Sequence, residues 1–209
     1  MLGVRTTGPQ AHDRAARSAL GKRIAFLVAV AMAASACAPG KLVGQPLPSP
    51  VAPNFVLTDG STGETVELAS RSGHVVLLTF LYTQCVDTCP LTAETIRNAR
   101  DKLGDAAKDV DFLAVSVDPI GDTPATTRQF VQDHRLSGVL RYLIGPRDAL
   151  ARVWQAYGVA QGQAQGSPIV AHTDVIYLVD RHIRGRVVLH SDVTVDDLAT
   201  DLRILASER

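Results

Sequence analysis

Two stretches of the chain are almost continuously apolar over the length of one β-strand. His74 to Tyr82 and Val110 to Val117 are rich in valine, leucine and phenylalanine. Such short apolar runs predict strands that are buried on both faces of a sheet. Before them, Phe55 to Leu57 and Thr65 to Leu68 flank a glycine-containing turn, which predicts a small β-hairpin.

Residues that start and end helices divide the rest of the chain. Pro90 occupies a favoured helix-start position, and Thr123-Pro124 and Thr194 open later helices. The predicted helices run from Pro90 to near Gly104, from Thr123 to near Gly138, from Asp148 to Tyr157, and from Thr194 through Leu198, Leu202 and Leu205. Short strands are predicted at Leu140 to Ile144, Val175 to Val179 and Arg186 to His190.

The order of these elements indicates the fold. A strand–helix–strand unit is followed, after further helices, by a strand–strand–helix unit, and two cysteines lie at the first strand–helix junction. This is the thioredoxin-like arrangement. We therefore expect an α/β protein with a thioredoxin-like fold, in which an N-terminal β-hairpin precedes a central sheet flanked by helices.

The first 36 residues have the layout of a signal peptide. Basic residues precede an apolar run from Ile24 to Ala34, which ends in Ala34-Ser35-Ala36-Cys37. The run is shorter than the about 20 residues that cross a bilayer. The cysteine after small residues resembles a bacterial lipoprotein box, although Ala34 replaces the usual leucine. We expect residues 1–36 to be removed and Cys37 to be lipidated; an ordinary signal peptide or an uncleaved anchor is the alternative.

A proline-rich segment follows Cys37. Pro39, Pro46, Pro48, Pro50 and Pro53 favour extended, solvated chain, so residues 37–51 are predicted to be a tether and residues 52–209 the domain. Each interpretation of the leader places this domain outside the cytoplasm, on the extracytoplasmic face of a bacterial cell envelope.

The charge of the chain limits its partners. The net charge is zero, but the first 36 residues contain five basic residues and one acidic residue. The remaining chain has 16 basic and 20 acidic residues. A mildly acidic domain lacks the basic surface that binds nucleic acid, so we exclude nucleic acid as a partner.

Cys85 and Cys89 are the candidate chemical groups. They lie where an apolar strand gives way to a helix, whose N-terminus stabilises thiolate over thiol. Two thiols at this spacing can close a disulfide, attack a disulfide or hold a soft metal ion. A disulfide with only a structural role is a further interpretation. It is less favourable, because a structural bridge rarely spans so short a loop at an exposed helix entry.

Two thiolates need a further ligand to complete a metal site, and His172 is the candidate. It precedes the predicted strand Val175 to Val179, and in a thioredoxin-like fold the loop that enters this strand approaches the active-site cysteines. The other histidines are predicted to lie in the leader, on the surface, at a helix end or beside a hairpin: His12, His74, His134, His182 and His190.

Three segments, in order, resemble a known family. Cys85-Val86-Asp87-Thr88-Cys89-Pro90, preceded by Phe80 to Thr83, is similar to the CPDxCP-type signature of Sco/SenC proteins, the copper-handling factors of cytochrome c oxidase assembly. Ser116 to Pro124 resembles the family's S-x-D-P-x-x-D-T-P segment, and Val170 to Asp180 its V-x-H-T…YLxD segment. Val86 replaces the common proline, and Asp180-Arg181-His182 lacks the usual D-P-x-G turn.

The resemblance implies that Cys85, Cys89 and His172 ligate copper, as Cu(I) or Cu(II), and that the cysteines also form a Cys85–Cys89 disulfide. Asp87 either tunes the site or faces solvent. Asp118 and Asp122 are expected to cap a turn and the following helix, and Tyr82, Trp154 and Tyr157 to serve in packing.

The implied function is a membrane-tethered copper metallochaperone, not an enzyme. It would take copper from a donor and assist assembly of the copper-site subunit of cytochrome c oxidase, as a monomer held to the membrane by its lipid anchor. The alternative is a thiol–disulfide oxidoreductase that reduces cysteines of that subunit, for which His172 would be dispensable. A peroxiredoxin-like peroxidase fits less well, because no arginine accompanies Thr83 near the cysteines.

Overall fold

The computed structural model describes residue 3 and residues 40–48, 50–163 and 169–208. The chain forms two units, Met1–Gly40 and Lys41–Arg209. Of the predicted signal peptide only Gly3 is described, and Cys37 lies outside the described residues. No helix in the described part is long and apolar enough to cross a bilayer. All elements below belong to Lys41–Arg209.

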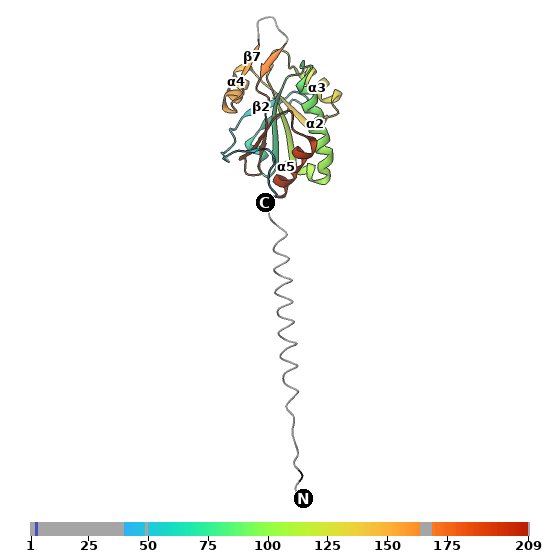
Figure 1. Ribbon diagram of the computed structural model, residues 1–209. Helices are drawn as coiled ribbons and strands as arrows, with labels where there is room; N and C mark the ends of the chain where they lie inside the picture. Colours follow the sequence, from blue (N-terminus) through green and yellow to red (C-terminus); the bar gives the residue numbers. More distant parts are fainter. Residues whose placement is uncertain (1–2, 4–39, 49, 164–168, 209) are drawn as a thin grey trace. The chain divides into compact units, whose positions relative to one another are not determined.

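An eight-stranded mixed sheet forms the centre of this unit (Figure 1). Its strands β4, β5 and β6 are parallel, and every other neighbouring pair is antiparallel. In spatial order the strands are β1 (Gln45–Pro46), β10 (Gly185–Leu189), β9 (Ile176–Val179), β4 (Val75–Leu81), β5 (Val110–Ser116), β6 (Leu140–Ile144), β2 (Val56–Asp59) and β3 (Thr65–Glu67).

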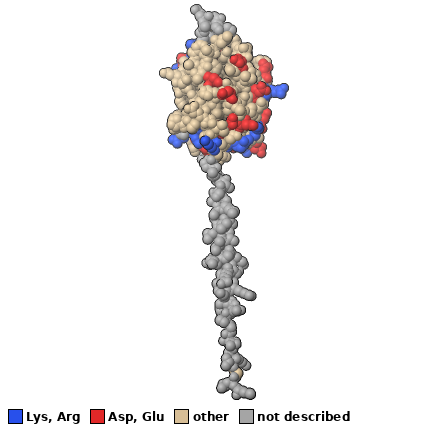
Figure 2. Space-filling model, in the orientation of Figure 1, with Lys and Arg blue, Asp and Glu red and all other residues tan. Residues whose placement is uncertain are grey.

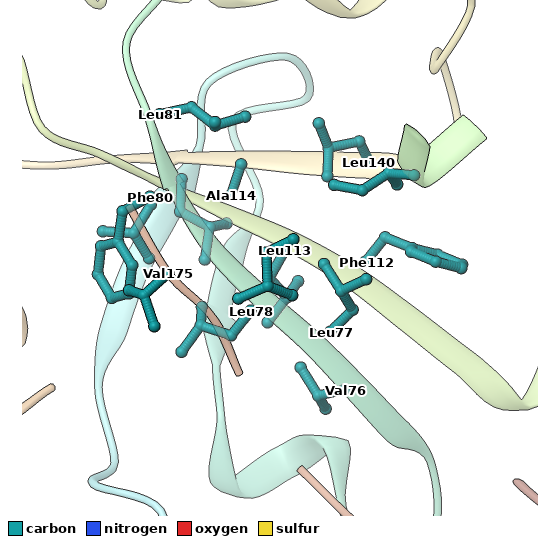
Figure 3. Close-up of a cluster of buried hydrophobic side chains, with 14 of the residues drawn as sticks. Val76, Leu77, Leu78, Phe80, Leu81, Phe112, Leu113, Ala114, Leu140 and Val175 are labelled. Carbon is teal, nitrogen blue, oxygen red and sulfur yellow. The ribbon is translucent and has the colours of Figure 1, made fainter. Parts of the chain in front are cut away.

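The two apolar runs of the sequence form the central strand pair. All seven residues of β4 are buried, and its register with β5 pairs Val75 with Val110 and Leu81 with Ser116. Figure 3 shows the buried side chains of these strands, among them Leu77, Leu78 and Leu113. Each fully buried side chain of this size contributes about 1.5–3 kcal/mol of transfer free energy. The prediction of two-sided burial is confirmed.

In the described part of the chain, four α-helices and two 3₁₀ helices surround the sheet (Figure 1). They are η1 (Ala69–Arg71), α2 (Thr88–Leu103), η2 (Gly104–Asp109), α3 (Pro124–Asp133), α4 (Arg147–Ala156) and α5 (Val195–Ser207). Helices α2 and α5 pack against each other (Figure 1). Thr123 and Thr194 cap α3 and α5 by accepting from the backbone N–H groups of Thr126 and Asp197. The expected α/β, thioredoxin-like class with an N-terminal hairpin is confirmed.

Helix α3 ends earlier than predicted. We expected it to continue to near Gly138, but it stops at Asp133, and Arg135 adopts a positive φ of 55°. Leu136 N–H then donates to Val131 O and Arg135 N–H to Gln132 O. This is a Schellman termination with arginine in the position that glycine usually takes, so no glycine marks this helix end in the sequence.

The N-terminal arm, residues Lys41–Val51, corrects the predicted tether. The folded unit begins at Lys41 instead of Ala52, and β1 pairs with the edge strand β10. The carboxylate of fully buried Asp201 accepts from Val43 N–H (2.7 Å) and Gly44 N–H (2.9 Å). Prolines do not prevent this pairing, because Leu47 lies between two of them and still donates its N–H to Arg186 O.

A second, separate hairpin was not predicted. Strands β7 (Gln161–Gln163) and β8 (Val170–His172) form a two-stranded sheet in which Gln161 pairs with His172. Its base is fastened by two hydrogen bonds, from Thr173 N–H to Ala160 O and from Ala160 N–H to the Thr173 hydroxyl. This hairpin carries the predicted third ligand.

Candidate metal centre

The cysteine loop begins where β4 ends. The sheet ladder closes with Val117 N–H donating to Leu81 O, and a turn follows in which Cys85 N–H donates to Tyr82 O (3.3 Å). Helix α2 starts at Thr88, two residues before Pro90. The two cysteines are therefore held by the exit of a central strand on one side and the first turn of a helix on the other.

Cys85 and Cys89 lie together, as predicted. Cys89 N–H points to Cys85 Sγ at 3.3 Å, a charge-stabilising hydrogen bond from a helix N-terminus. Both residues are free thiols in this structure, so the disulfide remains a prediction for the oxidised protein. Cys85 is 8% exposed and Cys89 is 1% exposed, which makes Cys85 the sulfur that a reagent or partner reaches first.

The two thiols are electrostatically unequal. Burial acts to raise the pKa of Cys85, but hydrogen bonds from the Cys89 side chain, the Asp87 and Cys89 backbone and the Thr88 hydroxyl lower it below the ordinary thiol value. Burial and the neighbouring Cys85 raise the pKa of Cys89 well above that value. The pair thus combines one thiol that ionises readily with one that holds its proton.

His172 lies beside Tyr82, the residue that follows β4 and precedes the cysteines. Its Nδ1 lies 3.0 Å from Thr173 O, and its ring meets the Tyr82 ring edge-on, with centroids 6.0 Å apart and an interplanar angle of 88°. Nδ1 as the donor in that contact leaves Nε2 for a metal ion. Within the described residues, no three His, Cys, Asp or Glu side chains are grouped closely enough to hold a metal.

Asp122 has a different role from the predicted one. Thr123 caps α3, whereas Asp122 accepts from Thr83 N–H (2.8 Å), from the Ser116 hydroxyl (2.6 Å) and from the Tyr142 hydroxyl (3.2 Å). Burial raises its pKa, against the opposing effect of these hydrogen bonds. Asp122 therefore connects the cysteine loop to β5 and β6.

The other aspartates agree better with expectation. Asp118 caps a turn by accepting from Ile120 and Gly121 N–H, as predicted. Asp87 is exposed at the N-terminus of α2 and its side chain makes no capping hydrogen bond. Val86, at the departure from the family signature, is 95% exposed between the cysteines.

The remaining described histidines have local partners. His74 lies 3.6 Å from an Asp111 carboxylate oxygen, and His190 Nδ1 lies 2.7 Å from Asp174 O. The His134 ring contacts the Phe130 ring at an interplanar angle of 51°. His182 is exposed in the turn after β9. In that turn Ile183 takes a positive φ of 57°, at the place where the family's D-P-x-G pattern is missing.

Sequence reasoning treated Tyr82 as packing and did not single out Ser116 or Tyr142. Tyr82 is buried with its ring against His172, and burial, followed by the electrostatic effect of the neighbouring Cys85, raises its pKa to about 12. Tyr142 is fully buried with its hydroxyl on Asp122. Ser116 could have been found from its place in the second family segment. Tyr142 lies in none of the three segments, so nothing in the sequence pointed to its contact with Asp122.

Charged side chains are unevenly distributed over one face of the molecule (Figure 2). Figure 2 shows Lys and Arg gathered toward the lower end of the folded unit and acidic side chains over the middle and right of the same face. The described residues on that face form no continuous basic surface.

The chain is similar to known proteins over most of the folded unit. The family described as SCO1/SenC matches residues 43–207. ScoI of Bradyrhizobium japonicum, solved with copper bound, is 31% identical with a TM-score of 0.67, over 75% of this chain and 99% of that one. Apo Sco1 of Thermus thermophilus is 28% identical with a TM-score of 0.70, over 81% and 99%.

A curated relative gives the same result at lower identity. The SCO2-like protein of Rickettsia typhi is 22% identical over 156 residues, which cover 71% of this chain and 74% of that protein. Because the SCO1/SenC match spans well over half of the sequence, the chain belongs to the SCO1/SenC family.

Proposed function

We propose that the protein is an extracytoplasmic copper chaperone that holds copper through Cys85, Cys89 and His172. The observation that carries the proposal is the pair of free thiols at the start of α2, with the Cys89 N–H directed at Cys85 Sγ. Thiolate and imidazole donors suit Cu(I), and an added oxygen ligand would suit Cu(II). The copper-bound ScoI relative supports this cargo.

The cargo's destination is part of the proposal. We infer that copper passes from a donor protein to the copper-site subunit of cytochrome c oxidase by exchange of ligands. Both cysteines are buried, so the recipient must contact the surface around Cys85 to reach the ion. A lipid on Cys37, after removal of residues 1–36, would keep the domain near this membrane-embedded client.

Copper titration tests the ligand set. Reduced full-length protein is titrated with Cu(I) and Cu(II), alongside Cys85→Ser, Cys89→Ser and His172→Ala, with His182→Ala as the matched control on an exposed histidine. We expect each ligand variant to lose at least about tenfold in copper affinity, because mutation of residues that merely support metal ligands already lowers metal affinity by about 10–100-fold. Wild-type affinity in His172→Ala would remove His172 from the site.

A second candidate is thiol–disulfide exchange on the same subunit. The opposed pKa shifts favour it, because a readily ionised Cys85 and a proton-holding Cys89 match an attacking and a resolving thiol. In this reaction the Cys85 thiolate would attack a client disulfide, forming a mixed disulfide and releasing one client cysteine as a thiolate. Cys89, having passed its proton to that thiolate, would then attack Cys85 Sγ, release the second client cysteine as a thiolate and close the Cys85–Cys89 bond. Full client reduction by His172→Ala without copper would favour this function.

The anchor needs its own test. Cells expressing wild type or Cys37→Ser are labelled with a radioactive fatty acid and separated into membrane and soluble fractions. We expect only wild type to carry label. Equal labelling of both chains would exclude Cys37 as the acylation site.

A further inference from the structure

Three arginines line one hollow on the surface of the folded unit. The hollow has a volume of about 370 Å³ and lies between α2 and the turn that follows α3. Three basic residues and one acidic residue give its lining a formal net charge of +2. A concave site that combines apolar and charged side chains is the usual form of a small-ligand site. The lining residues are Arg97, Asn98, Arg100, Asp101, Arg135, Leu136 and Val139.

Two of these arginines are available to a ligand. Within residues 40–48, 50–163 and 169–208, Arg100 donates to no group besides the Asp101 carboxylate (3.0 Å), and the Arg135 side chain has no hydrogen-bonding or ion-pairing partner. A guanidinium has five N–H donors, so most of those of Arg100 and all of those of Arg135 are open to a ligand or to water. Arg97 is more engaged, because it is ion-paired with Glu94 (2.9 Å).

The backbone of Arg135 is strained at this position. Its φ of 55° lies in the left-handed region, which glycine adopts freely and residues with a Cβ adopt with strain. It stands where the Schellman termination of α3 usually has glycine. The side chain is exposed, so its burial does not offset the strain. Strained residues of this kind gather at ligand sites, and a role in binding would account for arginine here.

We propose that this hollow binds a phosphate-bearing anion through Arg135 and Arg100, with Arg97 as a weaker third contact. The planar fork of a guanidinium matches two oxygens of a phosphate group in paired hydrogen bonds. Several arginines around one hollow suit the multiple oxygens of a phosphate better than the two oxygens of a carboxylate. Free phosphate and the phosphodiester headgroup of an anionic lipid share this chemistry, and both are small enough for the hollow.

The anion site is separate from the proposed copper centre. Arg97 and Arg100 belong to the same helix as Cys89, but they lie further along it. With a rise of 1.5 Å per residue, they are about 12 Å and about 17 Å from Cys89 along the helix axis. The inference therefore goes beyond the proposed function, and copper binding and anion binding can be tested and can fail separately.

Titration calorimetry on the full-length chain tests the site with two soluble probes. They are inorganic phosphate and glycerophosphoglycerol, which is the headgroup of phosphatidylglycerol without its acyl chains. We expect dissociation constants of about 1 mM at low salt and weaker binding as sodium chloride is added, because salt screens partly exposed charges. Arg135→Gln should weaken binding of both probes by at least about tenfold, since hydrogen bonds to charged groups are stronger than those between neutral groups.

Two further variants separate anion binding from folding and from net charge. Arg135→Gly also removes the side chain but suits the positive φ, so it should lose binding while its Tm equals or exceeds that of wild type. Arg128→Gln removes one positive charge at an exposed arginine of α3 that does not line the hollow, and it should bind both probes as wild type does. All three variants should keep the Cu(I) affinity of wild type.

The relative affinity of the two probes identifies the source of the anion. Tighter binding of glycerophosphoglycerol would indicate a lipid headgroup, tighter binding of inorganic phosphate would indicate a free phosphate, and both results support the site. The site is refuted if wild type binds neither probe, if the Arg135 variants bind as wild type does, or if Arg128→Gln loses as much affinity as Arg135→Gln. A lower Tm in Arg135→Gly would overturn the argument from backbone strain.

Discussion

Removal of the Asp122 carboxylate is expected to loosen the fold at the cysteine loop. Asp122 is 5% exposed and accepts three hydrogen bonds, from the Thr83 backbone and from the hydroxyls of Ser116 and Tyr142. Asp122→Ala would leave all three donors without this acceptor. Tyr142 is fully buried, so water cannot easily replace the lost partner there.

The size of the effect follows from the donors. Each unsatisfied buried group costs about 1–3 kcal/mol, and removal of a desolvated carboxylate offsets part of this cost. We expect Asp122→Ala to lower the free energy of unfolding by about 3 kcal/mol. For a domain of this size, that corresponds to a fall in Tm of about 6–12 °C.

Asp122 also predicts a pH dependence with a definite sign. Its pKa is raised in the fold, so the folded state binds the proton more tightly than the unfolded state does. The stability that Asp122 adds is fully present below pH 3.8, the pKa of this carboxyl in the unfolded chain. It is lost as the pH rises through the higher pKa of the folded state. Wild type should therefore gain stability relative to Asp122→Asn as pH falls toward 4.

Urea unfolding, followed by the fluorescence of the single tryptophan, measures both effects. Trp154 is suited to this because its buried indole donates to Ser116 O, next to the Asp122 network. Asp133→Ala, on an exposed aspartate, is the control and should change stability by less than about 0.5 kcal/mol. A loss below about 1 kcal/mol in Asp122→Ala, or parallel pH curves for wild type and Asp122→Asn, would refute the reasoning.

Three further predictions concern the thiols and the N-terminal arm. Iodoacetamide at neutral pH should alkylate Cys85 well before Cys89, because Cys85 is the more exposed of the two and has a lowered pKa. Mass spectrometry measures the order of alkylation, and the reverse order would contradict this. Asp201→Ala should cost about 2–4 kcal/mol and speed hydrogen exchange in the arm, since two backbone donors lose their acceptor. Gly44→Ala should lower the free energy of unfolding in urea by about 1–3 kcal/mol, because its Cβ would lie 2.2 Å from a Val187 methyl. Gly162→Ala is the control, because its Cβ would meet nothing within 4 Å.

The predictable parts of the fold are those with local signals. Strands β4 and β5 were found from continuous apolar runs, and α3 and α5 from threonines that do cap them. The close approach of Cys85 and Cys89 followed from their spacing at a helix start. In each case, the information lay within one turn or one strand of the residue concerned.

The parts that were missed depend on partners far along the chain. Proline content predicted a free tether, but the arm is held by Asp201, about 157 residues away, and only the folded chain brings that carboxylate to Gly44. The role of Asp122 was misassigned because Thr123 next to it supplied the cap, while its real partners come from the cysteine loop, β5 and β6. Tyr82 looked like packing because its contact with His172 joins the loop after β4 to the separate β7–β8 sheet.

The candidate site is supported unequally on its two sides, and this shapes how it should respond to mutation. The cysteine side is fixed by the central sheet through the Leu81–Val117 hydrogen bond and by Asp122 through Thr83. The histidine side stands on β8, which among the described strands pairs only with β7. The Thr79 hydroxyl, donating to Val175 O, ties the chain after His172 back to β4. Changes on the cysteine side should therefore alter folding and both sulfurs together, whereas changes on β8 should alter copper affinity with little loss of stability.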